Sequence, residues 1–155
     1  HCCTYYLNPG LYIMTNFELL NVGDEAEIYH TITDDDVSVY VKLTGDDNPL
    51  HVDEDFASKT KFGKRIVHGM LSASFISTLI GTKLPGKGAL WYEQHTKFIK
   101  PVYIGERIKV WGKVLHKSNA IKVIKAEIVI YGQDGRKVIT CEAKIALVGK
   151  KEQEK

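Results

Sequence analysis

Residues 45–51 (GDDNPLH) place a carboxylate and an imidazole close together in the chain. These are side chains that can exchange protons with a substrate. Between Asp46 and His51 stands Asn48-Pro49, and proline fixes its own φ angle and pushes the preceding residue toward extended geometry, which predicts a turn. Across that turn the two side chains can point into one space and hold a single water molecule. Because an ordinary histidine titrates near pH ~6.5, His51 can take or give a proton under cellular conditions.

The same residues also fit roles without chemistry. Asp46 and Asn48 can satisfy backbone groups of a polar turn while His51 caps a helix. On spacing alone, this structural interpretation is the stronger one. Asp53 and the acidic residues after it suggest a metal site, but they continue into an exposed helix start, and no second histidine stands at ligand spacing from His51. We therefore expect no metal ion.

The residues before and after this segment predict one strand and two helices. Residues 24–32 predict a first strand, and Thr33 followed by three aspartates signals a helix start, because negative charge suits a helix N-terminus. That short helix is expected to stop near Gly45. From residue 66 to 84, apolar residues recur every three or four positions with small residues between them, which predicts the longest and most central helix.

The remaining sequence predicts strands at residues 90–99, 107–116, 121–131 and 137–148. In the last of them apolar and polar residues alternate, which is typical of an antiparallel sheet with one face in water. The last three strands form a meander whose dry face the long helix must cover. The expected fold class is α+β, a curled antiparallel sheet around one helix. Because the edges of such a sheet are normally paired or shielded, we expect self-association.

Length and composition indicate one domain. The chain has 155 residues, 44% hydrophobic and 26% charged, which suits a single globular unit. Its 21 Lys and Arg against 19 Asp and Glu leave a net charge of +2, too small and too evenly spread for nucleic-acid binding. No apolar run approaches the roughly 18 to 20 residues of a membrane helix. We expect a domain at residues 14–149, preceded by an N-terminal extension (1–13) and followed by a charged tail (150–155).

The cysteines predict no disulfide framework. Cys2 and Cys3 are adjacent, Cys141 lies in an alternating apolar stretch, and no CxxC pair is present. Residues 1–13 lack the basic start, apolar centre and cleavage site of a secretory signal. We therefore expect a reduced, cytoplasmic protein.

Several separated segments resemble the hydratase 2 motif of the MaoC-like dehydratases. The likeness is closest to the (R)-specific enoyl-CoA hydratases and spans nearly everything after Met14. It is carried, in the family's order, by residues 45–53 (GDDNPLHVD) with Phe56-Ala57, 66–71 (IVHGML), 84–88 (LPGKG), 98–102 (FIKPV) and 104–106 (IGE). Several motifs in the right order are far more specific than a lone aspartate and histidine.

This resemblance implies a hot-dog fold, in which an antiparallel sheet wraps one long helix, and that agrees with the pattern of elements above. It also implies a homodimer or higher homo-oligomer, with the acyl-CoA near the subunit interface. Residue by residue, the family's catalytic pair falls on Asp46 and His51, its supporting serine on Ser77 and its backbone oxyanion donor on Gly69. The neighbouring Asp47 does not match the motif's spacing, so we expect it to be dispensable.

The implied reaction is reversible addition of water to a trans-2-enoyl-CoA, giving the (3R)-3-hydroxyacyl-CoA without a metal or redox cofactor. Asp46 and His51 would act as a coupled acid-base pair, and we favour Asp46 as the group that activates water. The Gly69 N–H would stabilise charge developing on the thioester carbonyl oxygen.

Substrate-binding residues are expected around these groups. Asn48 and His68 adjoin the catalytic residues in the motifs, and His68 can brace the loop. Ile80 matches a tunnel residue in the family, and a branched side chain there predicts short acyl chains. Coenzyme A carries phosphates, so we expect basic residues at the mouth of the site, with Lys64, Arg65, Lys87 and Lys100 as candidates.

Three alternatives share part of this description. A 3-hydroxyacyl-[acyl-carrier-protein] dehydratase would use similar chemistry on a carrier-linked acyl group. A hot-dog acyl-CoA thioesterase would hydrolyse the thioester and would not require the Asn-Pro turn. A non-catalytic acyl-CoA-binding subunit would be expected to lack the acid-base pair, and both of its residues are present here.

Overall fold

The structure is a computed structural model of the chain, and it describes residues 16–148. The extension expected at residues 1–13 and the charged tail expected at 150–155 lie outside the described residues. The elements, in chain order, are α1 (Asn16–Leu19), β1 (Glu25–Thr31), α2 (Asp34–Thr44), α3 (Pro49–Val52), α4 (Glu54–Ser58), α5 (Gly69–Thr82), β2 (Ala89–Phe98), β3 (Arg107–Ser118), β4 (Val123–Tyr131) and β5 (Lys137–Leu147).

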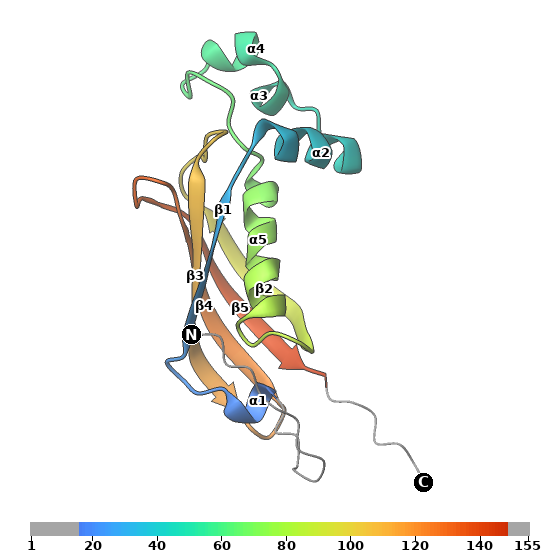
Figure 1. Cartoon of the computed structure of the whole chain (residues 1–155), viewed down its shortest axis with the longest axis vertical. Helices are drawn as coiled ribbons and strands as arrows, with labels where there is room; N and C mark the ends of the chain where they lie inside the picture. Colours follow the sequence, from blue (N-terminus) through green and yellow to red (C-terminus); the bar gives the residue numbers. More distant parts are fainter. Residues whose placement is uncertain (1–15, 149–155) are drawn as a thin grey trace.

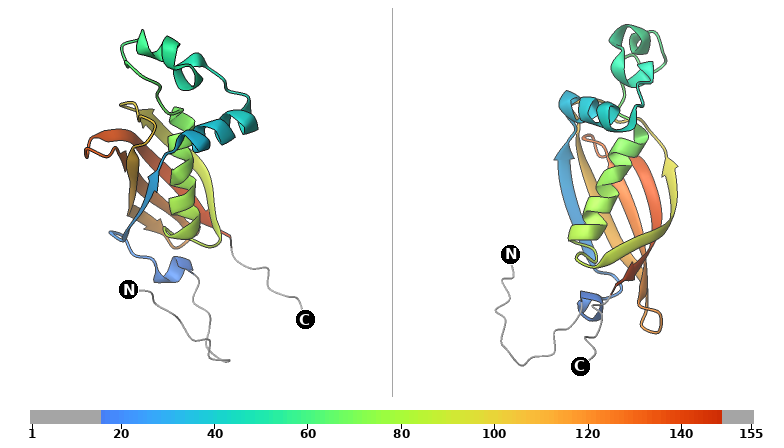
Figure 2. Two further views of the ribbon diagram at one scale, coloured as in Figure 1. Left: turned by 45° about the horizontal axis from the view of Figure 1, so that its top comes forward. Right: turned by 90° about the vertical axis from the view of Figure 1, so that its right-hand side faces the viewer.

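The strands form a single curled sheet around one helix. It has five strands in the order β1-β3-β4-β5-β2, and every neighbouring pair is antiparallel. β3, β4 and β5 make the expected meander, with β2 and β1 as the two edges. Figures 1 and 2 show α5 running along the inner face of the sheet, which curves around it. This arrangement confirms the α+β class and the hot-dog architecture.

The hydrophobic core lies between α5 and the sheet. Ile76 and Leu79 of α5 are completely buried together with Ile108 of β3 and Ile128 of β4. Burying one such side chain stabilises the fold by roughly 1.5–3 kcal/mol. Gly112 of β3 allows close packing, because a Cβ there would lie only 2.9 Å from Cδ2 of Leu79. The position of α5 on the sheet is thereby fixed, and with it the position of the residues at its N-terminus.

α2 begins where the sequence predicts. Thr33 Oγ1 accepts a hydrogen bond of 3.1 Å from the Asp36 N–H, and Asp36 Oδ2 accepts one of 2.9 Å from the Thr33 N–H. This reciprocal capping box satisfies two backbone donors at the helix start. Asp36 Oδ2 also lies 2.8 Å from Nε2 of His30 on β1, which ties α2 to the end of that strand. α2, α3 and α4 overhang the end of the sheet at which α5 begins (Figure 2).

α5 is shorter than the sequence predicts. The helix expected at residues 66–84 spans only Gly69–Thr82. Ile66 instead pairs with Tyr103 in an isolated antiparallel bridge. Because its backbone is held extended by that pairing, the apolar residues before Gly69 approach the helix without forming part of it, although their spacing is compatible with a helix.

Three further expectations, on the start of β4, on Cys141 and on membrane helices, can be compared with the structure. β4 begins at Val123 rather than at residue 121, since Lys122 adopts a left-handed φ of 53° in the preceding turn. Cys141 is free and buried, and burial raises the pKa of its thiol, which makes it unreactive. Among residues 16–148, no helix is both long and apolar enough to cross a membrane.

Candidate active site

The loop after α2 presents Asp46 at the overhanging end of the sheet. α2 ends at Gly45, whose N–H donates to the Val41 carbonyl at 2.8 Å and whose φ of 76° is left-handed. Glycine adopts this conformation without strain, so the chain can turn sharply out of the helix. Asp46 follows with its side chain 52% exposed. One of its oxygens, Oδ1, accepts a long hydrogen bond of 3.3 Å from the Asn48 N–H.

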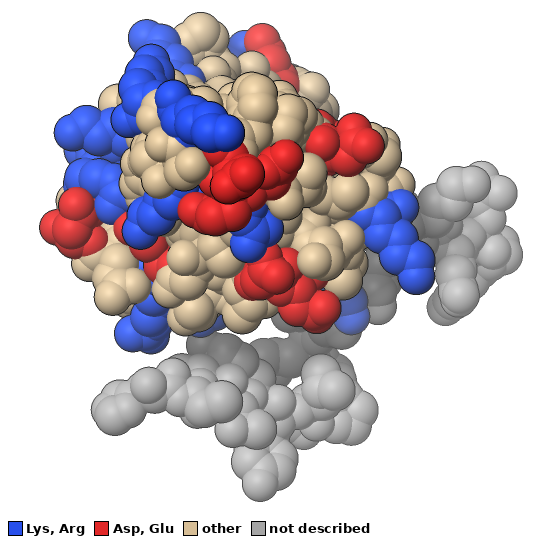
Figure 3. All heavy atoms as spheres, turned by 90° about the horizontal axis from the view of Figure 1, so that it is seen from above, with Lys and Arg blue, Asp and Glu red and all other residues tan. Residues whose placement is uncertain are grey.

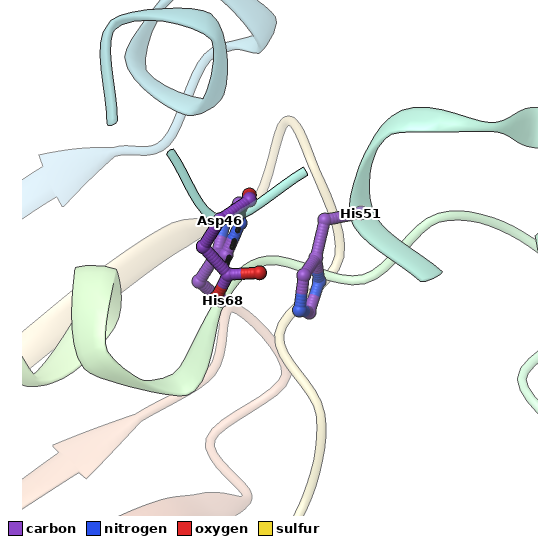
Figure 4. Close-up of side chains that lie close together, drawn as sticks. All are labelled: Asp46, His51 and His68. Carbon is purple, nitrogen blue, oxygen red and sulfur yellow. Dashed lines mark hydrogen bonds and ion pairs between the residues drawn. The ribbon is translucent and has the colours of Figure 1, made fainter. Parts of the chain in front are cut away.

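Asn48 shapes the turn between the two candidate catalytic residues. Its Oδ1 accepts a hydrogen bond of 3.0 Å from the Leu50 N–H, and Pro49 occupies the first turn of α3. Proline suits this position because the backbone N–H that it lacks would have no helical partner. The structural role considered for this turn is therefore present, and it sets His51 on α3 beside Asp46 (Figure 4). Asn48 itself is not among the residues that line the adjacent cavity.

The ring of His51 is held in one orientation by the backbone. Nδ1 lies 2.8 Å from the carbonyl oxygen of Ile66. Since a carbonyl oxygen only accepts hydrogen bonds, Nδ1 carries the proton and Nε2 of the neutral ring keeps its lone pair. Burial lowers the pKa of His51 below its ordinary value, with nearby His68 acting in the same direction and the Ile66 carbonyl and Asp46 opposing it. The neutral ring is thus favoured, with Nε2 as a proton acceptor.

His68, the residue before α5, contacts both Asp46 and His51. It is 2% exposed, and its Nε2 donates to the Asp46 carbonyl oxygen at 2.9 Å. Its ring lies against that of His51, with centroids 3.8 Å apart and planes at 33° (Figure 4). On another side it meets the Tyr40 ring at 4.8 Å. The bracing role expected for His68 therefore has a concrete geometry, and its expected role in substrate binding stays a prediction.

The three side chains lie close to one another. One oxygen of Asp46 and one nitrogen each of His51 and His68 all lie within 4.8 Å of one another. A separation of that size between a carboxylate oxygen and an imidazole nitrogen is one that a single water can bridge with two hydrogen bonds. Asp46 and His51 therefore lie close enough to share one water molecule, an arrangement that the Asn-Pro turn allows.

The same cluster raises the question of a metal ion. No second histidine stands at ligand spacing from His51 in the sequence, but His68 comes from a distant segment to lie beside it in the fold. However, a proton on His68 Nε2 is required by its bond to the Asp46 carbonyl, which removes that lone pair for a metal. The cluster then offers one carboxylate and one imidazole nitrogen, fewer than the three protein ligands of a typical catalytic zinc. This donor set suits proton transfer better.

A cavity of about 480 Å³ opens next to His51. Its inner wall is apolar, formed largely by the buried side chains of Val67, Val102 and Ile139. Lys61 and Lys100, both exposed, line it closer to solvent. Seen from the end that carries α3 and α4, Lys and Arg are most numerous on one side of the molecule, although both signs of charge occur across this face (Figure 3). The cavity is thus suited to a ligand with an apolar part and an anionic part.

Gly69 lies in the cavity wall at the first position of α5. A Cβ at this residue would lie 2.8 Å from Cδ1 and Cε1 of the Phe98 ring. The ring therefore occupies the space that a larger residue would need. Phe98 is 53% exposed at the end of an edge strand, so its ring has room to move. The first N–H groups of a helix have no intrahelical partner, which leaves the Gly69 N–H available as a donor.

Two expected site residues of α5 do not reach this cavity in the single chain. Ser77 is exposed on the helix, away from the cavity-lining residues. Ile80 is 2% exposed and packs in the core, so the expected tunnel wall is formed by other residues here. Both side chains lie toward the C-terminal half of α5, whereas the cavity lies at its N-terminus.

The expected basic residues separate into different roles. Lys100 lines the cavity, and Lys64 lies over the Tyr103 ring at 4.7 Å. Arg65 is already paired, since its guanidinium lies 2.7 Å from Asp34 and 3.3 Å from Glu54. It also donates to the His51 carbonyl at 3.3 Å, which fastens α3 and α4 to the start of α2. Arg65 thus has a structural role in the single chain, and its expected role in phosphate binding stays a prediction.

Lys87 is the clearest departure among the basic candidates. It follows the C-terminus of α5, a helix of 14 residues that spans about 21 Å at 1.5 Å per residue. The cavity lies at the other end of that helix. Its position in the LPGKG motif gives no indication of this separation.

Some lining residues were not singled out from the sequence. Lys61 and Phe62 come from the turn after α4, and Ser72 lies on α5 one turn beyond Gly69. For Ser72 a signal existed, because residues three positions apart share a helix face. For Lys61 the sequence offers none, since a lysine in a polar turn is usually just solvated.

A comparison with known protein families shows to which family the chain belongs. A model described as the MaoC like domain matches residues 22–135, most of the chain. The chain belongs to the MaoC-like domain family. Among relatives, the (R)-specific enoyl-CoA hydratase of Rhodospirillum rubrum is 46% identical over 96 residues, 62% of this chain and 67% of that protein. The (R)-specific enoyl-CoA hydratase of Aeromonas caviae is 36% identical over 130 residues, 83% of this chain and 96% of that protein.

Solved structures agree with this family membership. The unliganded R-hydratase of Pseudomonas aeruginosa superimposes with a TM-score of 0.80 at 34% identity, over 90% of this chain and 93% of that one. Asp46, His51, Gly69 and Ser77 all lie within the matched part of this MaoC-like domain. Ile139 of β5, which completes the cavity wall, lies just beyond it.

Proposed function

We propose that this MaoC-like domain is an (R)-specific enoyl-CoA hydratase, a hydro-lyase that reversibly hydrates trans-2-enoyl-CoA to (3R)-3-hydroxyacyl-CoA. The observation that carries the proposal is that a carboxylate oxygen of Asp46 and a ring nitrogen of His51 lie within 4.8 Å of each other, with His51 lining a largely apolar cavity. Two relatives, at 46% and 36% identity, are named (R)-specific enoyl-CoA hydratases.

The pair can supply the proton transfers that hydration needs. A water molecule that donates one hydrogen bond to Asp46 and one to His51 keeps a lone pair for attack on C3 of the enoyl thioester. As the O–C3 bond forms, one O–H bond breaks, and the electrons of the C2=C3 bond move toward the thioester carbonyl. The proton taken from water is then returned to C2, so water adds across the double bond without any other reactant. Dehydration is the reverse sequence.

We favour Asp46 as the group that activates water. The fixed Nδ1 proton of His51 and its lowered pKa make Nε2 an equally suitable acceptor near neutral pH. Asp46 and His51 therefore act as a coupled pair, and a measured pKa would belong to both of them.

The start of α5 can stabilise the charge that develops during this reaction. The Gly69 N–H has no intrahelical partner and lies at the positive end of the helix dipole. A thioester carbonyl oxygen placed there would be stabilised as it gains negative charge. Loss of such a donor typically costs about 3 to 4 kcal/mol in the transition state.

The cavity suits a short acyl chain linked to coenzyme A. Its inner end is closed by Val67, Val102 and Ile139, while Lys61 and Lys100 stand closer to solvent, where phosphates can pair with them. No resident metal or redox cofactor is required by this chemistry. We place the enzyme in the cytoplasm.

We further propose that the enzyme works as a homodimer. β2 is an edge strand of ten residues whose Leu90, Tyr92 and Phe98 are each at least half exposed. Such an edge is normally paired or covered. Ser77 is also exposed on α5, and its expected supporting role requires that a second copy bring it to a site.

The direct test follows loss of the conjugated enoyl thioester absorbance when the purified chain is mixed with crotonyl-CoA. We expect hydration to (3R)-3-hydroxybutyryl-CoA, identified by chiral analysis, without release of free thiol. Release of coenzyme A would identify a thioesterase instead. Much faster turnover of crotonyl linked to acyl carrier protein than of crotonyl-CoA would identify a carrier-protein dehydratase.

A further inference from the structure

Ser72 is an unusual residue in the wall of the cavity. Apart from Ser72 and the catalytic candidate His51, the inner lining is apolar, and the two lysines stand closer to solvent. Ser72 lies on α5, is 1% exposed, and is the only uncharged hydroxyl among the lining residues. In ligand pockets, isolated polar groups in an apolar wall usually fix the orientation of a ligand and select for it.

The Ser72 hydroxyl has no hydrogen-bond partner within the described part of the chain. Two other hydroxyls of α5 bond to the backbone of the preceding turn. Ser74 donates to the Leu71 carbonyl at 2.6 Å, and Thr82 to the Thr78 carbonyl at 2.6 Å. A buried donor left without a partner destabilises the folded state, so its presence calls for something that pairs with it.

A second unpartnered atom lies one helical turn away. Nδ1 of His68 is buried and makes no hydrogen bond with any group of residues 16–148, and His68 precedes Ser72 by four residues at the start of α5. Because Nε2 of this ring carries its proton, Nδ1 is an acceptor. A hydroxyl donor and an imidazole acceptor are therefore buried on neighbouring turns, and both are unsatisfied.

We propose that Ser72, supported by His68, recognises an uncharged hydroxyl group on the acyl chain, so that the preferred substrates are 2-enoyl thioesters hydroxylated at C4. A substrate hydroxyl can accept a bond from Ser72 and donate one to His68 Nδ1, which satisfies both. A carboxylate at the same place on the acyl chain is a poorer match. The inner wall of the cavity has no Lys or Arg to pair with it, and Asp46, which would repel it, already lies next to His68. This inference rests on the proposed hydratase activity.

The distances along helix and acyl chain agree with this choice of carbon. Ser72 follows Gly69 by three residues, a rise of about 4.5 Å along α5. With the thioester carbonyl at the Gly69 N–H, a hydroxyl on C4 lies four bonds from the carbonyl carbon, about 5 Å away in an extended chain. The path passes the Phe98 ring, which is half exposed and free to move aside.

The test compares two substrates of equal size, trans-4-hydroxybut-2-enoyl-CoA and trans-pent-2-enoyl-CoA, which differ by a hydroxyl in place of a methyl group. The ratio of their kcat/KM values is measured in the wild-type chain, in Ser72→Ala and in Ser74→Ala. Ser74 is the matched control because it is exposed on the same helix and its hydroxyl is already bonded. The hydroxyl group also changes the intrinsic reactivity of the substrate by induction. That effect is the same in every variant, so it cancels when the kcat/KM ratios of two variants are compared.

We expect the ratio to fall about 5- to 30-fold in Ser72→Ala and to stay unchanged in Ser74→Ala, as loss of one buried hydrogen bond would give. Ser72→Ala should also raise the melting temperature by a few degrees, since it removes an unpartnered buried group. An unchanged ratio in Ser72→Ala, with pentenoyl-CoA still hydrated, overturns this inference and leaves the hydratase intact. Failure of the wild-type chain to hydrate either substrate overturns the hydratase proposal itself.

Discussion

The rings of His51 and His68 lie against each other with centroids 3.8 Å apart, and His68 also donates a hydrogen bond to the backbone carbonyl of Asp46. One buried residue at the start of α5 therefore positions both members of the proposed acid-base pair. Asp46 comes from the loop after α2 and His51 from α3, so without this contact the two segments could move independently. The precise placement that proton transfer requires thus depends on the packing of α5.

The lowered pKa of His51 predicts the pH dependence of the reaction. Burial favours the neutral ring, so kcat/KM for hydration should stay level from pH 8 downward and fall only below 6.5, the ordinary value for histidine. The stability of the folded chain should also decrease as pH falls. Below pH 6.5 the unfolded chain binds a proton at this residue before the folded chain does, so the contribution of His51 to stability decreases as pH falls. The measurement is kcat/KM for crotonyl-CoA between pH 5 and 8, and a midpoint above 6.5 would contradict the assignment.

The contact between Gly69 and Phe98 predicts the outcome of adding one methyl group. Gly69→Ala places a Cβ 2.8 Å from the Phe98 ring, so the ring or the helix start must shift, and we expect kcat to drop at least tenfold. Phe98→Leu in the same chain removes the clash. If the double variant regains part of the lost activity, displacement of Phe98 contributes to the defect. If it regains none, the methyl group acts by blocking the substrate.

Arg65 and Lys100 should respond differently to removal of their charges. Arg65→Met loses ion pairs to two largely exposed carboxylates, which are worth about 0.2–1 kcal/mol each, and should leave KM for crotonyl-CoA nearly unchanged. Lys100→Met should raise KM several-fold, and added salt should reduce that difference because it screens the lysine in the wild-type chain. Steady-state kinetics at low and high salt check both. A larger KM effect for Arg65→Met than for Lys100→Met would restore the phosphate-binding role expected from the sequence.

The ion pair between Glu106 and Arg136 should stabilise the cavity wall. Both side chains are mostly buried, and Arg136 also donates to the Pro101 carbonyl at 2.7 Å. Burial alone raises the pKa of Glu106, but hydrogen bonds from Arg136 and from the Tyr103 N–H outweigh it and leave this pKa below the ordinary 4.5. The pair therefore contributes its full stability above pH 4.5 and loses it as pH falls through the lowered value.

Glu106→Gln should accordingly lower the free energy of unfolding by about 2–3 kcal/mol at pH 7, with the difference from wild type shrinking below pH 4.5. Urea unfolding at both pH values measures it. Asp134→Asn is the control, because Asp134 pairs with the same arginine but is largely exposed, and it should change stability far less. Equal losses in the two variants would show that the buried pair has no special role.

Much of the fold could be predicted because it depends on local patterns. The alternation in β5 and the capping residue Thr33 act over a few neighbouring residues, and both elements lie where expected. The start of α5 could not be placed from periodicity, since Ile66 has helical spacing but pairs with Tyr103 across the fold. A local pattern contains no information about such a partner.

In the site, too, the local features could be predicted and the contacts between distant segments could not. The turn between Asp46 and His51 follows from Asn48-Pro49, and the family resemblance adds their roles. The contact of His68 with Asp46 joins residues 22 positions apart and depends on how α5 packs against the overhanging helices. Arg65 likewise pairs with Asp34, which lies 31 positions away in the sequence. This ion pair could not be predicted without the fold.

The central claim is that Asp46, rather than its neighbour Asp47, shares a water molecule with His51. The most direct measurement is the initial rate of crotonyl-CoA hydration by the wild-type chain and by Asp46→Ala, His51→Ala and Asp47→Ala, all confirmed to be folded. We predict losses of about 10²- to 10⁴-fold for the first two variants and a rate close to wild type for Asp47→Ala. Full activity in Asp46→Ala, or a collapse in Asp47→Ala alone, would contradict the account.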